Sequence, residues 1–356
     1  MKTKTLNITE IKYSTVTVVA SKFLVLAVPV LPLASSTASH ILGQLSNGTW
    51  LENLAVRPNG NLLVAQAYPT SVLYTVSHPS RGKPSLESLV NIPTVQNLHG
   101  ISQVSVSSGQ ETYIVIGGNA TGLAAPITGE FSAWILSFVR TSHGERVDAC
   151  KISDMSEHST FLNGVTSIPG VSNAVLVADS ATGVVGYHNV TTGDFDTTAF
   201  TFPEMSTVGG ASSSIGVNRI HILDSYLYWT NSFFVSLFRV RILPSGYPVP
   251  CATPELVANL SGTATTLDDF AFGNDGGVYI TTNLDNSIIR VDPATGLSRT
   301  VIGSKDSMLV AGSTTVAFGK GLHGGTLYVT TSGALGAPVN GTKTEGAKVV
   351  AVEIEF

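Results

Sequence analysis

Two distant stretches of the chain share one pattern: "LDDFAFGNDGGVYITTNLDNSIIRVDPATG", residues 267–296, and "LENLAVRPNGNLLVAQAYPTSVLYTV", residues 51–76. In each, an acidic residue opens an apolar strand, a turn containing Gly follows, and a second strand returns. Internal repetition indicates a fold built from similar units. The repeat therefore predicts the architecture, and the architecture predicts where a site can lie.

Six segments fit this template, and each predicts two short strands joined by a Gly, Asn or Asp turn. They begin at Glu52, His99, Asn163, Gly216, Asp268 and Thr314. A third apolar strand follows each copy, and outer segments such as "SLESLVNI", "DTTAFTF" and "PELVANL" supply a fourth. Four strands in about 45 to 60 residues form a propeller blade, so the sequence predicts an all-β fold, a six-bladed β-propeller.

The last copy ends at Phe356 with three strands. We expect "SHILGQL", residues 39–45, to supply its outer strand and to close the ring. The 35 glycines and 16 prolines among 356 residues agree with many turns. A net charge of −5 without a run of Lys or Arg disfavours nucleic acid as a partner.

The N-terminal segment has a different composition. Lysines precede the apolar run "FLVLAVPVLPLA", and the small residues "SSTAS" follow it. This pattern predicts a signal peptide over residues 1–38, before a propeller over residues 39–356, and hence the secretory pathway, with a secreted or vesicular protein. The run is shorter than the roughly 20 residues of a spanning helix, so we expect no stable membrane span. A buried N-terminal strand is the alternative.

Sequons and cysteines agree with that compartment. Five N-x-[ST] sequons follow the segment and predict glycosylation at Asn47, Asn119, Asn189, Asn259 and Asn340. The cysteines are Cys150 and Cys251, and an even count in a secreted chain favours a disulfide. The repeat places the two on non-adjacent blades, whereas a disulfide needs Cα atoms within about 7 Å. Both outcomes stay open.

The first residue of each innermost strand comes close to the propeller axis. These residues are Glu52, His99, Asn163, Gly216 or Val217, Asp268 and Thr314. Antiparallel pairing places the end of the second strand beside them, which adds Gln66, Asp179, Asn231, Thr282 and Thr331. We expect these polar side chains to meet in one funnel, under the long connections "GNATGLAAPITGEFSAW" and "SGALGAPVNGTKTEGAK". The residues predicted to bind substrate there are Gln66, Asp179, Asn231, Thr282 and Thr314.

The types of these residues allow several chemistries. Glu52, Asn163 and Asp268 offer hard oxygen ligands for calcium or magnesium. His99 can be a fourth ligand, or a general acid or base near neutral pH. The alternative is that these groups only bond the backbone or water in the channel.

Aromatic side chains near the upper loops would give the funnel apolar walls. The candidates are Tyr68, Trp134, Phe233 and Phe234, whereas Trp229 is expected to pack between blades. A mostly apolar cleft with a few polar groups suits a small organic ligand. The sequence contains no G-x-S-x-G, Walker or H-E-x-x-H motif, so the common hydrolase, nucleotide and zinc-protease functions lack support.

The blade pattern resembles the gluconolactonase and senescence-marker-type propeller family. "LENLAV" supplies Glu52, "LNGVTSI" supplies Asn163 and "LDDFAFGNDGGVYITTN" supplies Asp268, the three positions at which that family holds a metal. The chain departs from the family at "LHGIS", where His99 replaces an amide or carboxylate, and in its weak fourth-blade motif. This resemblance implies a metal-dependent lactonase or hydrolase that uses calcium or another divalent metal.

The whole chain also resembles fungal six-bladed propeller proteins of natural-product pathways, especially the hetero-Diels–Alderases of tropolone sesquiterpenoid biosynthesis. That resemblance implies a cofactor-free pericyclase for two small-molecule substrates, a polar tropolone and an apolar humulene-type terpene. It implies that His99, Asn163 and Arg219 bond the tropolone oxygens and that Asp268 or Glu52 assists loss of water. A secreted binding propeller without catalysis is a further alternative.

Overall fold

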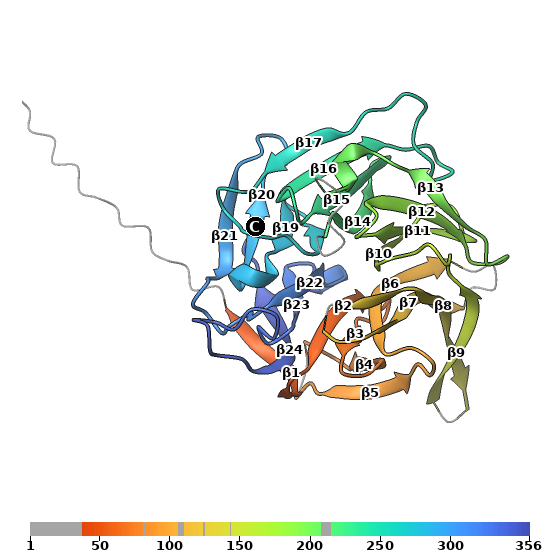
Figure 1. The fold of residues 1–356 in the computed structure, drawn as a ribbon. Coiled ribbons are helices and arrows are strands. Elements are labelled where there is room, and N and C mark those ends of the chain that lie inside the picture. The colour runs from red at the N-terminus through yellow and green to blue at the C-terminus, as the bar shows by residue number, and fades with distance from the viewer. Residues whose placement is uncertain (1–37, 81–82, 106–109, 124, 143, 208–214) are drawn as a thin grey trace, which may run out of the picture. The chain divides into compact units, whose positions relative to one another are not determined.

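The computed structural model describes residues 38–80, 83–105, 110–123, 125–142, 144–207 and 215–356. In this part of the chain, six four-stranded antiparallel sheets follow one another around a ring (Figure 1). The prediction of an all-β, six-bladed propeller is confirmed.

Within each blade the strands run outward from the axis in chain order, except in the last blade. The first three blades consist of β2 (Trp50–Val56), β3 (Leu62–Tyr68), β4 (Val72–Val76) and β5 (Leu86–Asn91); β6 (Asn97–Ser105), β7 (Glu111–Ala120), β8 (Pro126–Thr141) and β9 (Gly144–Asp154); and β10 (Leu162–Ser167), β11 (Ala174–Asp179), β12 (Val184–Asn189) and β13 (Phe195–Phe200). The last three consist of β14 (Val217–Leu223), β15 (Tyr226–Asn231), β16 (Ser236–Arg241) and β17 (Glu255–Asn259); β18 (Phe270–Phe272), β19 (Val278–Thr281), β20 (Ser287–Val291) and β21 (Ser298–Gly303); and β22 (Ser313–Phe318), β23 (Thr326–Thr331) and β24 (Gly346–Glu353) with β1 (Ser39–Asn47).

The last blade takes its outermost strand from the other end of the described chain. β1 pairs antiparallel with β24, with Ser39 opposite Val352 and His40 opposite Ala351. The red β1 and the blue β24 therefore lie side by side in Figure 1. The outer strand predicted from "SHILGQL" is confirmed, and it closes the ring.

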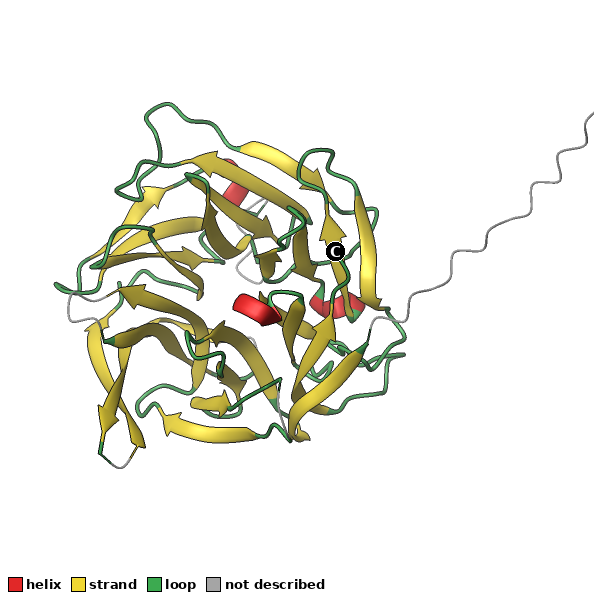
Figure 2. Cartoon of the chain, turned by 180° about the vertical axis from the view of Figure 1, so that it is seen from behind, coloured by secondary structure: helices red, strands yellow, loops and turns green. Residues whose placement is uncertain are grey.

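The described helices are short, as Figure 2 shows. They are the 3₁₀-helices η1 (Pro203–Met205), η3 (Asn283–Asp285) and η4 (Gly321–His323), each in a connection between strands. No helix in these described ranges has the length and apolar composition that crossing a membrane requires.

Apolar side chains pack between neighbouring blades. Val185 and Phe200 of the third blade, for example, share one buried cluster with Val217 and Trp229 of the fourth. Trp229 is fully buried and stacks on Phe238, which confirms its predicted packing role. Burying a Val or Phe side chain contributes about 1.5–3 kcal/mol, so these contacts fix each blade against the next and hold the axial residues in place.

The innermost strands are irregular where they reach the axis. The pairing register shifts within β2, β6, β10, β14 and β22, at or next to the residue that opens each repeat. Such a β-bulge adds one residue and re-aims its side chain. The residues at these bulges include Glu52, His99 and Asn163, whose side chains line a central cavity.

Two glycines allow the inner strands to approach one another. A Cβ on Gly100 would lie 2.5 Å from the carbonyl oxygen of Asn163, and a Cβ on Gly164 would lie 2.7 Å from that of Asn218. Any larger residue would push neighbouring blades apart at the axis. These glycines therefore keep the axial side chains within contact distance.

The two cysteines are free and exposed. Cys150 lies in β9 of the second blade, and Cys251 lies between β16 and β17 of the fourth. The third blade separates them, which is incompatible with the short Cα separation of a disulfide. Of the two outcomes left open, the structure shows the unpaired one.

The predicted signal peptide, residues 1–38, lies outside the described residues except for Ala38. Among the sequon asparagines, Asn47, Asn259 and Asn340 are exposed, and Asn119 and Asn189 are partly buried. Glycosylation stays a prediction.

Candidate functional site

A cavity of about 370 Å³ lies where the innermost strands begin. Its size is within the range of small-molecule sites. Residues of all six blades contribute to its lining. The polar part consists of Glu52, Asn97, His99, Asn163, Asn218, Thr266, Asp268 and Asn283, and the remainder is mainly apolar.

The four residues predicted to carry catalysis meet in this cavity. Glu52 of β2, His99 of β6, Asn163 of β10 and Asp268, two residues before β18, all line it, and none is more than 7% exposed. For the fourth blade, the sequence predicts Gly216 or Val217 as the residue nearest the axis, and the structure corrects this prediction. Val217 pairs with Asn231 inside the sheet, and the bulge that follows presents Asn218 to the cavity instead.

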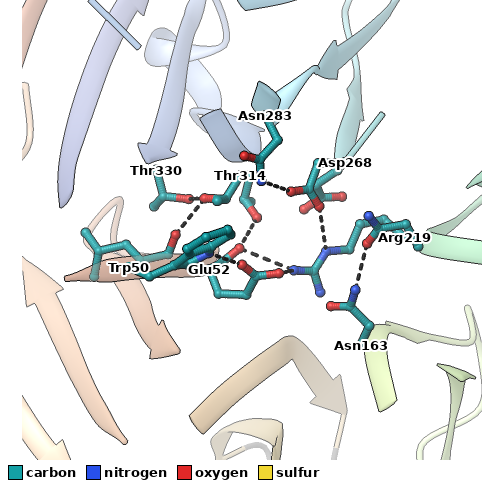
Figure 3. A network of polar contacts seen from close by, with 12 residues as sticks. Trp50, Glu52, Asn163, Arg219, Asp268, Asn283, Thr314 and Thr330 are labelled. Atoms are coloured by element: carbon teal, nitrogen blue, oxygen red, sulfur yellow. Dashed lines mark hydrogen bonds and ion pairs between the residues drawn. The ribbon is translucent and has the colours of Figure 1, made fainter. Parts of the chain in front are cut away.

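Arg219 of β14 places its guanidinium between the carboxylates of Glu52 and Asp268 (Figure 3). Its Nη2 donates to Oε1 of Glu52 at 2.5 Å, and its Nε lies 3.9 Å from Oδ1 of Asp268. The side chain is almost fully buried and is absent from the cavity lining. Arg219, predicted to bond a substrate, therefore contacts two carboxyl groups that line the cavity.

Burial raises the pKa of both carboxyl groups. The charge of Glu52 adds to this effect at Asp268, whose pKa lies well above its usual range, and Arg219 opposes the rise at both residues. Each carboxylate has one more partner: the indole N–H of Trp50 donates to Glu52, and Nδ2 of Asn283 donates to Asp268 at 2.9 Å. One guanidinium does not balance two desolvated carboxylates, so the pair binds a proton more readily than ordinary carboxyl groups and is suited to donate one.

His99 is neutral in this site. Burial, together with the charge of Arg219, lowers its pKa to about 3. Its ring contacts Phe161 edge-on, with the ring centres 5.4 Å apart. A neutral imidazole has one donor and one acceptor, so His99 can bond a ligand. This pKa does not support the predicted acid or base role near neutral pH.

Asn163 is fixed by its neighbour on the next blade. Its Nδ2 donates to Oδ1 of Asn218 at 2.8 Å, and Nδ2 of Asn218 donates to Ser232. Oδ1 of Asn163 has no hydrogen-bond partner among the described residues. The amide is therefore oriented, with one acceptor free.

Apolar and aromatic groups form the rest of the lining. They are Trp50, Ala67, Tyr68, Ala120, Leu123, Ala125, Pro126, Phe161, Ile215, Leu267, Leu284 and Gly336. Phe161 is held by Asp179, whose carboxylate accepts hydrogen bonds from the backbone N–H groups of Thr160 at 2.8 Å and Phe161 at 3.0 Å. Asp179, predicted to bind substrate, thus fixes the segment that carries a wall residue.

The other predicted binding residues, apart from Tyr68, lie outside the cavity lining. Four side chains donate to backbone carbonyl groups, which ties strand ends and loops together: Gln66 to Tyr68, Asn231 to Glu204 and Ser206, Thr282 to Ser287, and Thr314 to Leu51. The hydroxyl of Thr331 donates to the carbonyl oxygen of Lys348 and accepts a hydrogen bond from the backbone N–H of the same residue.

Three aromatic residues that were predicted to form the walls also lie outside the cavity lining. Phe233 and Phe234 form an edge-on pair, and Phe234 packs on the cluster between the third and fourth blades. Trp134 is buried and donates to Ser132.

The residues at the axis do not fit a divalent metal ion. In the described ranges, no group of three or more His, Cys, Asp or Glu could hold one. The two carboxylates of the expected ligand set, Glu52 and Asp268, instead have the Arg219 guanidinium between them. A fixed cation at this place repels a second one.

Three of the lining residues that were not predicted from the sequence bond to Glu52, Asp268 or Asn163. Trp50 lies two residues before Glu52, and residues two apart in a strand face the same side, so this signal was available. Asn283 directly follows the predicted Thr282. Asn218 depends on the bulge in β14, which no sequence signal marks.

Solved propellers share this fold at low sequence identity. A luciferin-regenerating enzyme matches with a TM-score of 0.62 and 13% identity, over 89% of this chain and 95% of that one. A regucalcin of Agrobacterium tumefaciens, described as a calcium-binding protein, matches with a TM-score of 0.59 and 14% identity, over 90% and 96%. These similarities show the fold alone.

Curated relatives are more informative. No family model matches the chain. A protein of Phoma sp is 28% identical over 309 residues, 79% of this chain and 83% of that protein. One of Sarocladium schorii is 26% identical over 309 residues, 79% and 75% respectively. Both are named "Putative hetero-Diels-Alderase", the second with the suffix asR5.

The predicted resemblance is confirmed. The relatives support an enzyme, a pericyclase-type propeller that catalyses cycloaddition.

Proposed function

We propose that the protein catalyses a hetero-Diels–Alder cycloaddition between a tropolone quinone methide and an alkene of a humulene-type sesquiterpene. The observation that carries this proposal is one cavity in which Glu52 and Asp268, a proton-holding carboxyl pair, adjoin a mostly apolar lining. The similarity to proteins named putative hetero-Diels-Alderase supports the type of cycloaddition, over 79% of the chain.

The first step is loss of water from a hydroxymethyl tropolone. The bond between the methylene carbon and its hydroxyl oxygen breaks, and a carboxyl proton passes to the leaving hydroxyl group. The tropolone O–H returns a proton to the carboxylate, so that water and the quinone methide are formed. Asp268 or Glu52 supplies this proton, because burial raises the pKa of each carboxyl group.

The second step is the cycloaddition. The O=C–C=CH₂ unit of the quinone methide adds across the alkene, forming one C–O and one C–C bond with no atom lost, and a dihydropyran ring results. Holding both reactants in near-attack geometry can contribute about 7–11 kcal/mol. Apolar residues such as Leu123 and Phe161 hold the terpene, and His99 and Asn163 bond the tropolone oxygens.

The proposed reaction needs no cofactor, since proton transfer and orientation suffice. An apolar enclosure also protects the quinone methide from attack by bulk water. The proposed setting is the secretory pathway, secreted or in a vesicle lumen, which rests on residues 1–38 and the five sequons after them.

The test is formation of the dihydropyran adduct from the two precursors, followed by chromatography and mass spectrometry. The wild-type protein should accelerate it, and Asp268→Asn should lower kcat about 10²–10⁴-fold because it removes a proton donor. Asp275→Asn is the matched control: this carboxylate pairs with Arg290 at 2.6 Å and is absent from the cavity lining, so the variant should stay active.

No acceleration by the wild-type protein, or an equal loss in both variants, would overturn the proposal. If both reactants bind and no adduct forms, the protein is a binding propeller without catalysis.

A further inference from the structure

The oxygen atoms around the axis form a donor set suited to a hard cation. Carboxylates of Glu52 and Asp268 and side-chain amides of Asn163, Asn218 and Asn283 line one cavity. Calcium binds six to eight such oxygens. Oδ1 of Asn163 and Oδ1 of Asp268 are buried and have no hydrogen-bond partner in the described part of the protein. Two oxygen atoms of this set are therefore unused as hydrogen-bond acceptors.

Arg219 lies within this set of oxygen atoms but makes few hydrogen bonds to it. Arginine commonly meets a carboxylate with two parallel hydrogen bonds. Here only Nη2 donates, to the side chain and the backbone carbonyl of Glu52, whereas Nε and Nη1 are buried without a hydrogen-bond partner among the described atoms. Asp268 is reached across 3.9 Å by charge alone. The guanidinium therefore balances charge more than it satisfies hydrogen bonds.

We infer that Arg219 is a built-in cation that takes the place of a divalent metal ion at the propeller axis. It is attached to β14 and is 1% exposed, so dilution or a chelator does not remove it. It partly balances the charge of the carboxyl pair and excludes calcium from the donor set. This inference goes beyond the proposed reaction and holds whichever chemistry the cavity performs.

The test is to remove the guanidinium and to ask whether calcium binds in its place. Arg219→Ala leaves two carboxylates and three amides around the vacated volume. We expect 10 mM calcium chloride to raise the Tm of this variant by about 5 °C, saturably, and to change the Tm of the wild-type protein by less than about 1 °C. Adding Glu52→Gln to Arg219→Ala should abolish the response, and Arg219→Lys, which keeps the charge, should show none.

Calcium binding by the wild-type protein, or a folded Arg219→Ala variant that ignores calcium, would overturn the inference. If Arg219→Ala folds poorly, the readout is the yield of folded protein after refolding with and without calcium. A yield that rises at least several-fold with calcium supports the inference, and a yield that calcium does not change contradicts it.

Discussion

Arg57 and Arg219 are both buried beside two carboxylates, in very different geometry. Arg57 lies in the loop after β2, at 2% exposure, and its Nε, Nη1 and Nη2 make four hydrogen bonds of 2.7–3.0 Å to Glu111 and Glu145. Its guanidinium also stacks on Phe138, 3.7 Å from the ring centre. Arg219 makes one hydrogen bond to a carboxylate, and two of its nitrogens have no hydrogen-bond partner among the described residues.

The carboxylates respond in opposite directions. Although burial opposes it, hydrogen bonding to Arg57 lowers the pKa of Glu111. Burial raises the pKa of Glu52 and Asp268 despite Arg219. A cluster whose hydrogen bonds are satisfied stabilises the fold, whereas an unsatisfied cluster in which the pKa values of the carboxyl groups are raised is suited to chemistry. The comparison separates a structural arginine from a functional one.

The largest effect should come from Arg219→Leu. Removing one partner of a buried ion pair leaves uncompensated charge and should lower the free energy of unfolding by about 3–5 kcal/mol at pH 8. Because the folded-state pKa values of Glu52 and Asp268 are raised, acidification protonates both groups, and the loss should be much smaller at pH 5. Urea unfolding at the two pH values measures this, and an equal loss at both would contradict the account.

Arg57→Leu should cost less, about 2 kcal/mol, since the side chains of Glu111 and Glu145 are 21% and 37% exposed and water can solvate them. The kcat of the folded variant should equal that of the wild-type protein, because Arg57 is absent from the cavity lining. Unfolding and steady-state rates measured on one preparation test both points. A loss of kcat with stability intact would break the distinction between the two arginines.

His99→Gln should remove one contribution to the pH dependence of the free energy of unfolding. The folded-state pKa of His99 is about 3, and that of an unfolded His is about 6.5, so the wild-type protein takes up a proton on unfolding between these values. This group alone should therefore lower stability by about 1.4 kcal/mol for each pH unit of acidification in that window. The variant should lack this slope, and parallel profiles for the two proteins would show that His99 is not held neutral.

The blades and the axial ring could be predicted from the sequence because both follow from a repeated pattern. Glu52, His99, Asn163 and Asp268 open their repeats and all reach the cavity. A β-bulge moves the fourth-blade position to Asn218, and a bulge depends on packing between blades that one strand does not reveal. Phe233 was misplaced for a similar reason, because loop direction is set by tertiary contacts such as those of Phe234.

The position of the Arg219 guanidinium between two carboxylates could not be predicted from the sequence either, since Glu52 and Arg219 are 167 residues apart. Arg219 was assigned to the substrate only through a resemblance. Its contact with Glu52 emerges when the first and fourth blades meet across the axis.

The most direct test of the account is the rate of dihydropyran formation by the wild-type protein after exhaustive dialysis against EDTA. With Arg219 as the resident cation, the chelated protein should form the adduct at the full rate, and added calcium should not change it. A rate that falls to the uncatalysed level after chelation and returns with calcium would contradict both the role of Arg219 and a metal-independent cycloaddition.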